Sequence, residues 1–154
     1  MLRYLFVLCS IVLISSCSHP KQFERESWLK NNDVNDTGNP RAYMTEDLLK
    51  NYLKTGLSKD SIIALLGKPY SDKIEQRLPK GMSIPDSISY TNSENIRADS
   101  NGRIMNQINE FMRLNSQPDT LMLYPVGWST IDPNFLVVKL DDQGQAIEFW
   151  IEQH

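Results

Sequence analysis

The chain of 154 residues has few of the residue types that most often carry catalysis or bind metals. Its two cysteines and two histidines lie near its ends, as Cys9, Cys17, His19 and His154. Neither a glycine-rich phosphate loop nor a metal-ligand spacing is present in the sequence. Catalysis would therefore depend on carboxylates or on a serine–lysine pair. The neighbours Ser58 and Lys59 are explained more simply as a helix cap and a solvated first turn. We therefore expect no enzyme, no cofactor and no metal.

Positive charge is also in short supply. The chain has 16 Lys and Arg against 19 Asp and Glu, which gives a net charge of −3. It contains no basic run and no interleaving of basic and aromatic residues, the usual features of nucleic-acid binding. We therefore expect no nucleic-acid partner and no electrostatic attachment to lipid headgroups.

What the sequence does have at its start is a targeting pattern. Arg3 provides a positive charge before the apolar run at 4–14, which is too short to span a bilayer comfortably. The run leads into Ile14-Ser15-Ser16-Cys17, which resembles the lipobox of bacterial lipoproteins. This resemblance implies removal of residues 1–16 as a signal peptide and acylation of Cys17. The alternatives are an ordinary secretory signal cut near Ser16 and an uncleaved anchor.

Lipidation at Cys17 would decide both the thiol chemistry and the location of the protein. Cys9 would leave with the signal peptide, so no disulfide, thiol nucleophile or zinc site could form. Several acyl chains, at about 0.8 kcal/mol per buried methylene, hold a protein on a membrane where one chain is marginal. Ser18 follows the cysteine, and by resemblance to enterobacterial lipoproteins this favours the outer membrane. Residues 17–38 are then a tether, from which Trp28 is expected to dock on the folded domain.

The folded domain is predicted to cover residues 39–154 and to begin with two helices. Apolar residues at helical spacing predict a helix over 41–54, and Gly56 ends it. A second helix over 59–66 is capped by Ser58 and stopped by Gly67 and Pro69. Because so short a helix is marginal alone in water, its apolar face must pack against the rest of the domain.

The middle of the domain, residues 71–119, reads as an insertion. Pro79, Gly81 and Pro85 interrupt regular structure, and Ser-, Asn- and Asp-rich sequence follows. A helical stripe within the insertion predicts an extra helix over 104–114.

Three strands are predicted at the end of the chain, over 120–126, 135–140 and 146–152. Alternation places Leu136, Val138 and Leu140 on one face, with Ile147, Phe149 and Ile151 on one face of the next strand. The remaining residues of that last strand point the other way: Ala146, Glu148, Trp150 and Glu152. We expect one face to be core and the other largely solvated, which is typical of an α+β fold with helices on one side of an antiparallel sheet.

Short motifs lie in both halves of the domain: Met44, Leu48, Leu49, Gly56-Leu57-Ser58, Leu65-Leu66-Gly67-Lys68-Pro69, Tyr124, Gly127, Ile131-Asp132, 136–140 and Gly144. In this order they resemble the SmpA/OmlA (BamE-like) bacterial lipoproteins. The resemblance implies an α-α-β-β-β fold shared with β-lactamase inhibitor proteins, no catalysis, and binding to other proteins. The long segment 71–119 departs from the family pattern.

The expected function is therefore that of a non-enzymatic envelope lipoprotein, a scaffold or accessory subunit that binds another envelope protein at the outer membrane. The alternative is an inhibitor-type or small-ligand-binding module that uses the exposed sheet face. The candidate binding surface is an apolar patch formed by Trp128, Ile131 and Trp150. Alternatively, Trp150 covers a second, minor core formed with the insertion.

Overall fold

A four-stranded antiparallel sheet, in the order β1-β2-β3-β4, is the central element of the computed structural model, which describes residues 21–90, 97 and 102–154. The strands are β1 (Ser71–Arg77), β2 (Gln117–Trp128), β3 (Pro133–Leu140) and β4 (Ala146–Gln153). The α-helices of these residues are α1 (Arg25–Lys30), α2 (Arg41–Asp47), α3 (Lys59–Leu66) and α5 (Arg103–Asn115). The predicted α+β class with an antiparallel sheet is confirmed.

Helix α3 has the capping that the sequence predicts, whereas α2 follows Pro40 without a side-chain cap. Helix α2 continues into a π-helical turn, η1 (Leu48–Tyr52), so the helical segment ends two residues before the predicted boundary. Helix α3 has the predicted bounds, and the Ser58 hydroxyl accepts a hydrogen bond from the Ser61 N–H at 3.2 Å. Gly67 ends α3 with φ at +80°, a conformation that favours glycine.

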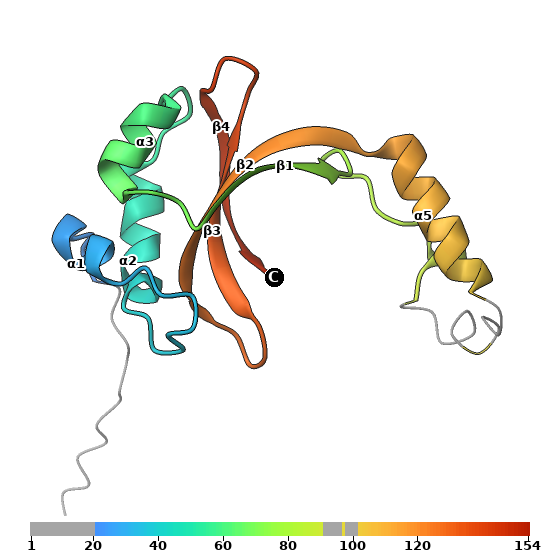
Figure 1. Cartoon of the computed structure of the whole chain (residues 1–154), viewed down its shortest axis with the longest axis horizontal. Helices are drawn as coiled ribbons and strands as arrows, with labels where there is room; N and C mark the ends of the chain where they lie inside the picture. The colour runs from blue at the N-terminus through green and yellow to red at the C-terminus, as the bar shows by residue number, and fades with distance from the viewer. Residues whose placement is uncertain (1–20, 91–96, 98–101) are drawn as a thin grey trace, which may run out of the picture.

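The main hydrophobic core lies between the sheet and the helices α1, α2 and α3 (Figure 1). Its fully buried members come from both layers: Leu48, Ile62, Leu66, Met122, Leu136 and Val138. Trp28 belongs to the same cluster, and its indole Nε1 donates to the Leu66 carbonyl at 3.1 Å. The prediction that Trp28 docks on the domain is confirmed.

The opposite face of the sheet is not largely solvated, and that expectation was wrong. Four side chains on this face form a second cluster, each at most 3% exposed: Leu121, Leu123, Phe135 and Val137. Strands β2 and β3 carry apolar residues at successive positions, so both of their faces are buried. Val34 and Trp150 pack against this second cluster at its margin.

A β-bulge changes the predicted faces of β4. The register shifts between Lys139 and Leu140, and Leu140 pairs with Ala146. Ala146 is therefore fully buried in the main core, although alternation had placed it on the opposite face. The bulge leaves Ile147 45% exposed, whereas Phe149 packs against the main core as predicted.

The segment 71–119 contains an element that the sequence analysis missed. Strand β1 pairs with the first part of β2, from Ser71 opposite Leu123 to Arg77 opposite Gln117. Because β1 is an edge strand with little burial, it lacks the apolar alternation that reveals strands in a sequence. The predicted helix over 104–114 is confirmed as α5.

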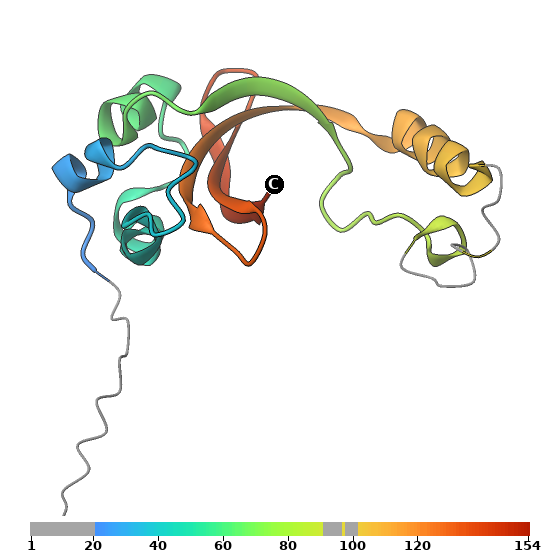
Figure 2. The same ribbon diagram turned by 60° about the horizontal axis from the view of Figure 1, so that its bottom comes forward.

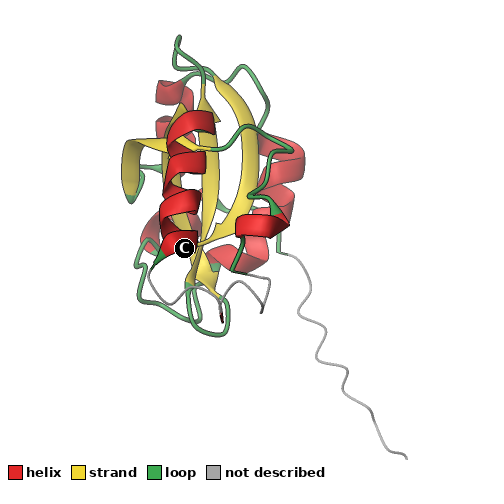
Figure 3. Ribbon diagram, turned by 90° about the vertical axis from the view of Figure 1, so that its right-hand side faces the viewer, coloured by secondary structure: helices red, strands yellow, loops and turns green. Residues whose placement is uncertain are grey.

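Strands β1 and β2 carry α5 away from the helices that cover the main core. In Figure 1, α1 lies at one end of the molecule and α5 at the other. Seen from the α5 end, this helix lies in front of the strands (Figure 3). We call this extension the arm: β1, residues 78–90, α5 and the first part of β2 up to Thr120.

The arm bends over the second face of the sheet, and the C-terminus lies beneath it (Figure 2). Arg77 on β1 bonds Glu152 on β4, with Nη2–carboxylate distances of 2.7 and 2.9 Å. Arg77 pairs with Gln117, and Glu152 lies in the pairing row of Pro125. In a flat sheet the two residues would therefore lie three strands apart and would also be displaced along the strands by the length of β2 from Gln117 to Pro125, roughly 26 Å. Their contact therefore requires the strongly bent sheet that the figures show.

Candidate binding surfaces

The sequence-predicted site residues lie in different settings. Cys17 is outside the described residues. The Trp128 indole Nε1 donates to the Val34 carbonyl at 2.7 Å, which ties Trp128 to the margin of the second cluster. Trp150 packs against that same cluster, whereas Ile131 belongs to neither described cluster and is 73% exposed. Trp150 is thus held against the second face, Trp128 is bonded to Val34 beside it, and Ile131 projects into solvent.

A charged network surrounds Trp150 where the arm crosses β4. The Arg77 guanidinium lies 5.5 Å from the centre of the Trp150 ring, and the indole Nε1 donates to Glu152 at 2.8 Å. Burial alone would raise the pKa of Glu152, but hydrogen bonds from Arg77 and Trp150 outweigh it and lower the pKa. Glu152 is therefore a carboxylate held by two donors from different strands.

The other charges on this face are paired as well. Lys80 forms an ion pair with Glu148, and Lys139 lies 2.7 Å from Asp119. Together with Arg77, Leu78 and Trp150 these residues line a cavity of about 240 Å³. Because each cation here already has an anion, the cavity offers no unsatisfied charge to a ligand. We interpret the network as the contact that positions the arm.

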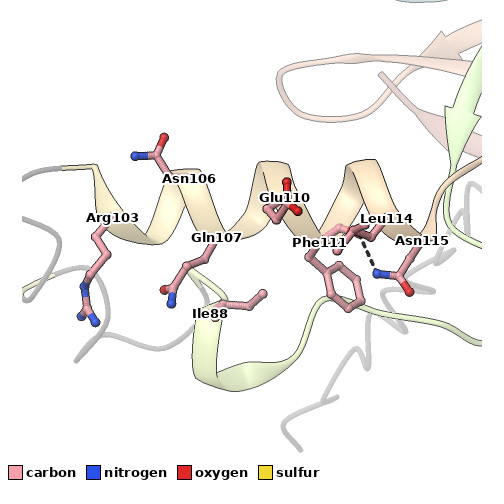
Figure 4. Close-up of a pocket in the computed structure, with 8 residues that line it drawn as sticks. All are labelled: Ile88, Arg103, Asn106, Gln107, Glu110, Phe111, Leu114 and Asn115. Carbon is pink, nitrogen blue, oxygen red and sulfur yellow. Dashed lines mark hydrogen bonds between the residues drawn. The ribbon is translucent and has the colours of Figure 1, made fainter.

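A larger groove, of about 580 Å³, lies at the far end of the arm, between α5 and the 3₁₀ turn η2 (Asp86–Ile88). Ile88 from η2 and Phe111 and Gln107 from α5 face each other across it, whereas Asn106 points away (Figure 4). The remaining lining residues are Arg103, Glu110, Leu114 and Asn115. The groove therefore combines an apolar floor with amide side chains.

The residues of α5 are only lightly packed. Ile104 is the one buried residue of the helix, whereas Leu114 is 64% exposed and Met105 is 46% exposed. Glu110 and Arg113 neutralise each other on the helix surface, with their closest atoms 2.7 Å apart. An amphipathic helix with an exposed apolar edge and little net charge is suited to contact with another protein chain.

The sequence analysis found part of this groove and missed the rest. Phe111 belongs to the helical stripe that predicted α5, but Ile88 follows Pro85 in sequence with no periodic pattern. The only signal for Ile88 was its place among the scattered apolar residues Met82, Ile84 and Tyr90.

Comparisons with protein-family models, with curated proteins and with solved structures found no match to this chain. None of the helices that the structure describes is both long enough and apolar enough to cross a membrane. Over the same residues, no group of three or more His, Cys, Asp or Glu side chains is placed to hold a metal ion.

Proposed function

We propose that this protein is a non-enzymatic lipoprotein, anchored at the outer membrane through acylated Cys17, that binds another envelope protein through its arm. The finer architecture proposed with it is that of the SmpA/OmlA type, in which a helical pair packs on one face of the sheet and the segment 71–119 is an insertion. The proposed role is that of a scaffold or accessory subunit facing the periplasm.

One observation carries the proposal. The arm contains a 13-residue amphipathic helix and two strands, and these elements bury little of their own apolar surface. Such surface is costly to expose unless a partner covers it, and exposed apolar patches of this kind mark interaction sites. The groove between α5 and η2 supplies both apolar contact and hydrogen-bonding amides to such a partner.

The position of the arm fits an anchored protein. The described chain begins at Lys21, close to α1, and α1 and α5 lie at opposite ends of the molecule (Figure 1). An anchor at Cys17 would therefore attach the end that carries α1 and leave α5 free to meet a partner. The second face of the sheet supports the alternative of a small-ligand module less well, because its charges are paired and Trp150 is held in place.

The partner is tested by crosslinking in membranes and co-purification of the full chain. Leu114→Glu places a charge on the groove, and Ile131→Glu places the same charge on a similarly exposed apolar residue at another site. We expect the first variant to lose the crosslinked protein and the second to keep it. Loss in Ile131→Glu with retention in Leu114→Glu would instead assign binding to the surface of Trp128, Ile131 and Trp150.

The anchor is tested separately. Cys17→Ser should abolish labelling by a fatty-acid analogue and leave the signal peptide uncleaved by the lipoprotein signal peptidase. A variant that still labels, or a wild-type protein that begins beyond Cys17, would exclude the lipid anchor.

A further inference from the structure

Arg41 is an unusual residue of the body of the molecule and takes no part in the proposed binding by the arm. It is the first residue of α2, and only 2% of it is exposed. Its Nε donates to the Trp28 carbonyl at 2.7 Å, and its Nη1 donates to the Pro125 carbonyl at 3.2 Å. The guanidinium also lies 4.5 Å from the centre of the Trp28 ring. The side chain is therefore fixed between α1 and β2.

This buried cation has no anionic partner in the part of the chain that the structure describes. Its contacts are two neutral carbonyls and one ring, and its Nη2, which makes no hydrogen bond with a described residue, is not among the fully buried atoms. Burying an ion without a counter-charge is costly, and buried arginines are normally paired. Consistent with this, burial lowers the pKa of Arg41 to about 10, against a weaker opposing effect of Tyr124.

A cavity of about 280 Å³ opens beside the guanidinium. It is lined by Asn32, Arg41, Lys68, Pro69, Tyr70 and Pro125. The lining includes two cations and no acidic residue, and Lys68 forms no ion pair within the described residues. This contrasts with the cavity beside Trp150, where every cation faces an anion.

We propose that the cavity beside Arg41 is a binding site for a carboxylate group. The free edge of the guanidinium provides planar donors that match a carboxylate, and Lys68 adds a second positive charge at the rim. Pro69, Tyr70 and Pro125 provide apolar walls for the carbon atoms that carry the carboxylate. At about 280 Å³ the cavity is smaller than most small-molecule pockets, so it fits a short acid or a single acidic side chain.

The competing explanation is that Arg41 only ties the Trp28 and Pro125 carbonyls together. That explanation accounts for the hydrogen bonds of Nε and Nη1, but it gives no role to the positive charge of the guanidinium or to Nη2. It predicts that added carboxylates leave Arg41 unaffected, which makes the two explanations distinguishable.

The test uses the full chain in non-ionic detergent, titrated with acetate and, as a control, with chloride at equal ionic strength. The measurements are the ¹⁵N–¹H signal of the Arg41 guanidinium and the melting temperature. We expect acetate, but not chloride, to shift the signal in a saturable way and to raise the melting temperature. An Arg41 signal that does not move with acetate, or that moves equally with chloride, would overturn the proposal.

A variant at the rim keeps the buried residue and the fold intact. Lys68→Gln should weaken acetate binding about two- to fivefold, as expected for one exposed charge. Its matched control is Lys54→Gln, which removes another exposed lysine, two residues after the π-helical turn. Equal acetate affinity in Lys68→Gln and Lys54→Gln would contradict the assigned site.

The source of the carboxylate is separated by a second pair of ligands. A short peptide with one aspartate and blocked ends, which competes with acetate at lower concentration, would indicate an acidic side chain of a partner. Competition no better than that of acetate itself would indicate a small organic acid. Binding by phosphate with no response to acetate would overturn the assignment to carboxylates.

Discussion

The two ends of β2 show how differently the body and the arm are built. From Leu121 to Gly127 the strand is buried on both faces, between the main core and the second cluster. From Gln117 to Thr120 the same strand is half-exposed and pairs with a β1 that is itself exposed. One continuous strand thus belongs to the buried body at its C-terminal end and to the exposed arm at its N-terminal end.

The two regions must therefore be held by different forces. The body is stabilised mainly by burial of apolar side chains between helices and sheet. The arm keeps its place through its backbone ladder with β2 and through the contact of Arg77 with Trp150 and Glu152. Truncating core residues should accordingly have the larger effect on stability, whereas breaking the Arg77 contact should mainly affect the position of the arm and reduce stability less.

The largest effect is expected for Leu66→Ala. Leu66 is fully buried in the main core, and such a truncation typically costs about 2–5 kcal/mol of unfolding free energy. Leu114→Ala is the matched change in the arm and should cost less than about 0.5 kcal/mol, because Leu114 is 64% exposed. Denaturant unfolding of the full chain measures both. Equal losses would contradict the division into a packed body and a lightly packed arm.

A smaller effect is expected where the body forces a close approach of the backbone. Gly67 has φ of +80°, and a Cβ there would lie 2.7 Å from Leu29 Cδ2. Gly144 has φ of +75°, and its Cβ would meet nothing within 4 Å. The positive φ should cost each alanine variant about 1–3 kcal/mol, and Gly67, whose ψ is −171°, occupies a region that is essentially restricted to glycine. Gly67→Ala should cost more in thermal unfolding, and equal costs would mean that the Leu29 side chain yields freely.

The contact that positions the arm should respond to acid. Because the pKa of Glu152 is below its ordinary value of 4.5 in the folded chain, its ionised form is stabilised by folding. This contribution is present above the unfolded pKa and is lost as pH falls through the lower folded pKa. Burial would raise the pKa of Glu75, but Lys73 and Arg77 together outweigh burial and lower that pKa, so Glu75 contributes in the same direction.

Unfolding of the parent and of Glu152→Gln, measured from neutral pH to about pH 3, checks this expectation. The parent should lose stability more steeply at acid pH than the variant, which has no carboxyl to titrate at this position. Parallel curves would show that the Arg77–Glu152 contact does not contribute.

The secondary-structure elements that could be predicted from the sequence are those whose apolar residues repeat with a helical or strand period. Helices α3 and α5 were predicted because their apolar residues repeat with helical spacing, and the capping residues of α3 mark its ends. The β3–β4 hairpin was predicted because apolar and polar residues alternate along both strands. The bulge that directs the Ala146 side chain into the core has no sequence signal. Strand β1 was missed because an exposed edge strand needs no apolar alternation.

The sites were harder to predict than the elements. The pairing of Arg77 with Glu152 joins the two edge strands across a bend of the sheet, and nothing local in the sequence specifies that bend. Arg41 looks like an ordinary first-turn residue until the structure places it between Trp28 and Pro125. Burial of a charge is a property of the assembled fold and not of its sequence neighbours.

The central claim is that an arm without a core of its own keeps one position because Arg77 holds Glu152. The direct measurement is the distance distribution between spin labels at two exposed residues, Asn106 on α5 and Asp142 in the β3–β4 turn. The account predicts one narrow distribution for the parent and a broad one for Glu152→Gln. The control Glu110→Gln, which breaks only the pair within α5, should remain narrow. A broad distribution in the parent, or an unchanged narrow one in Glu152→Gln, would contradict the account.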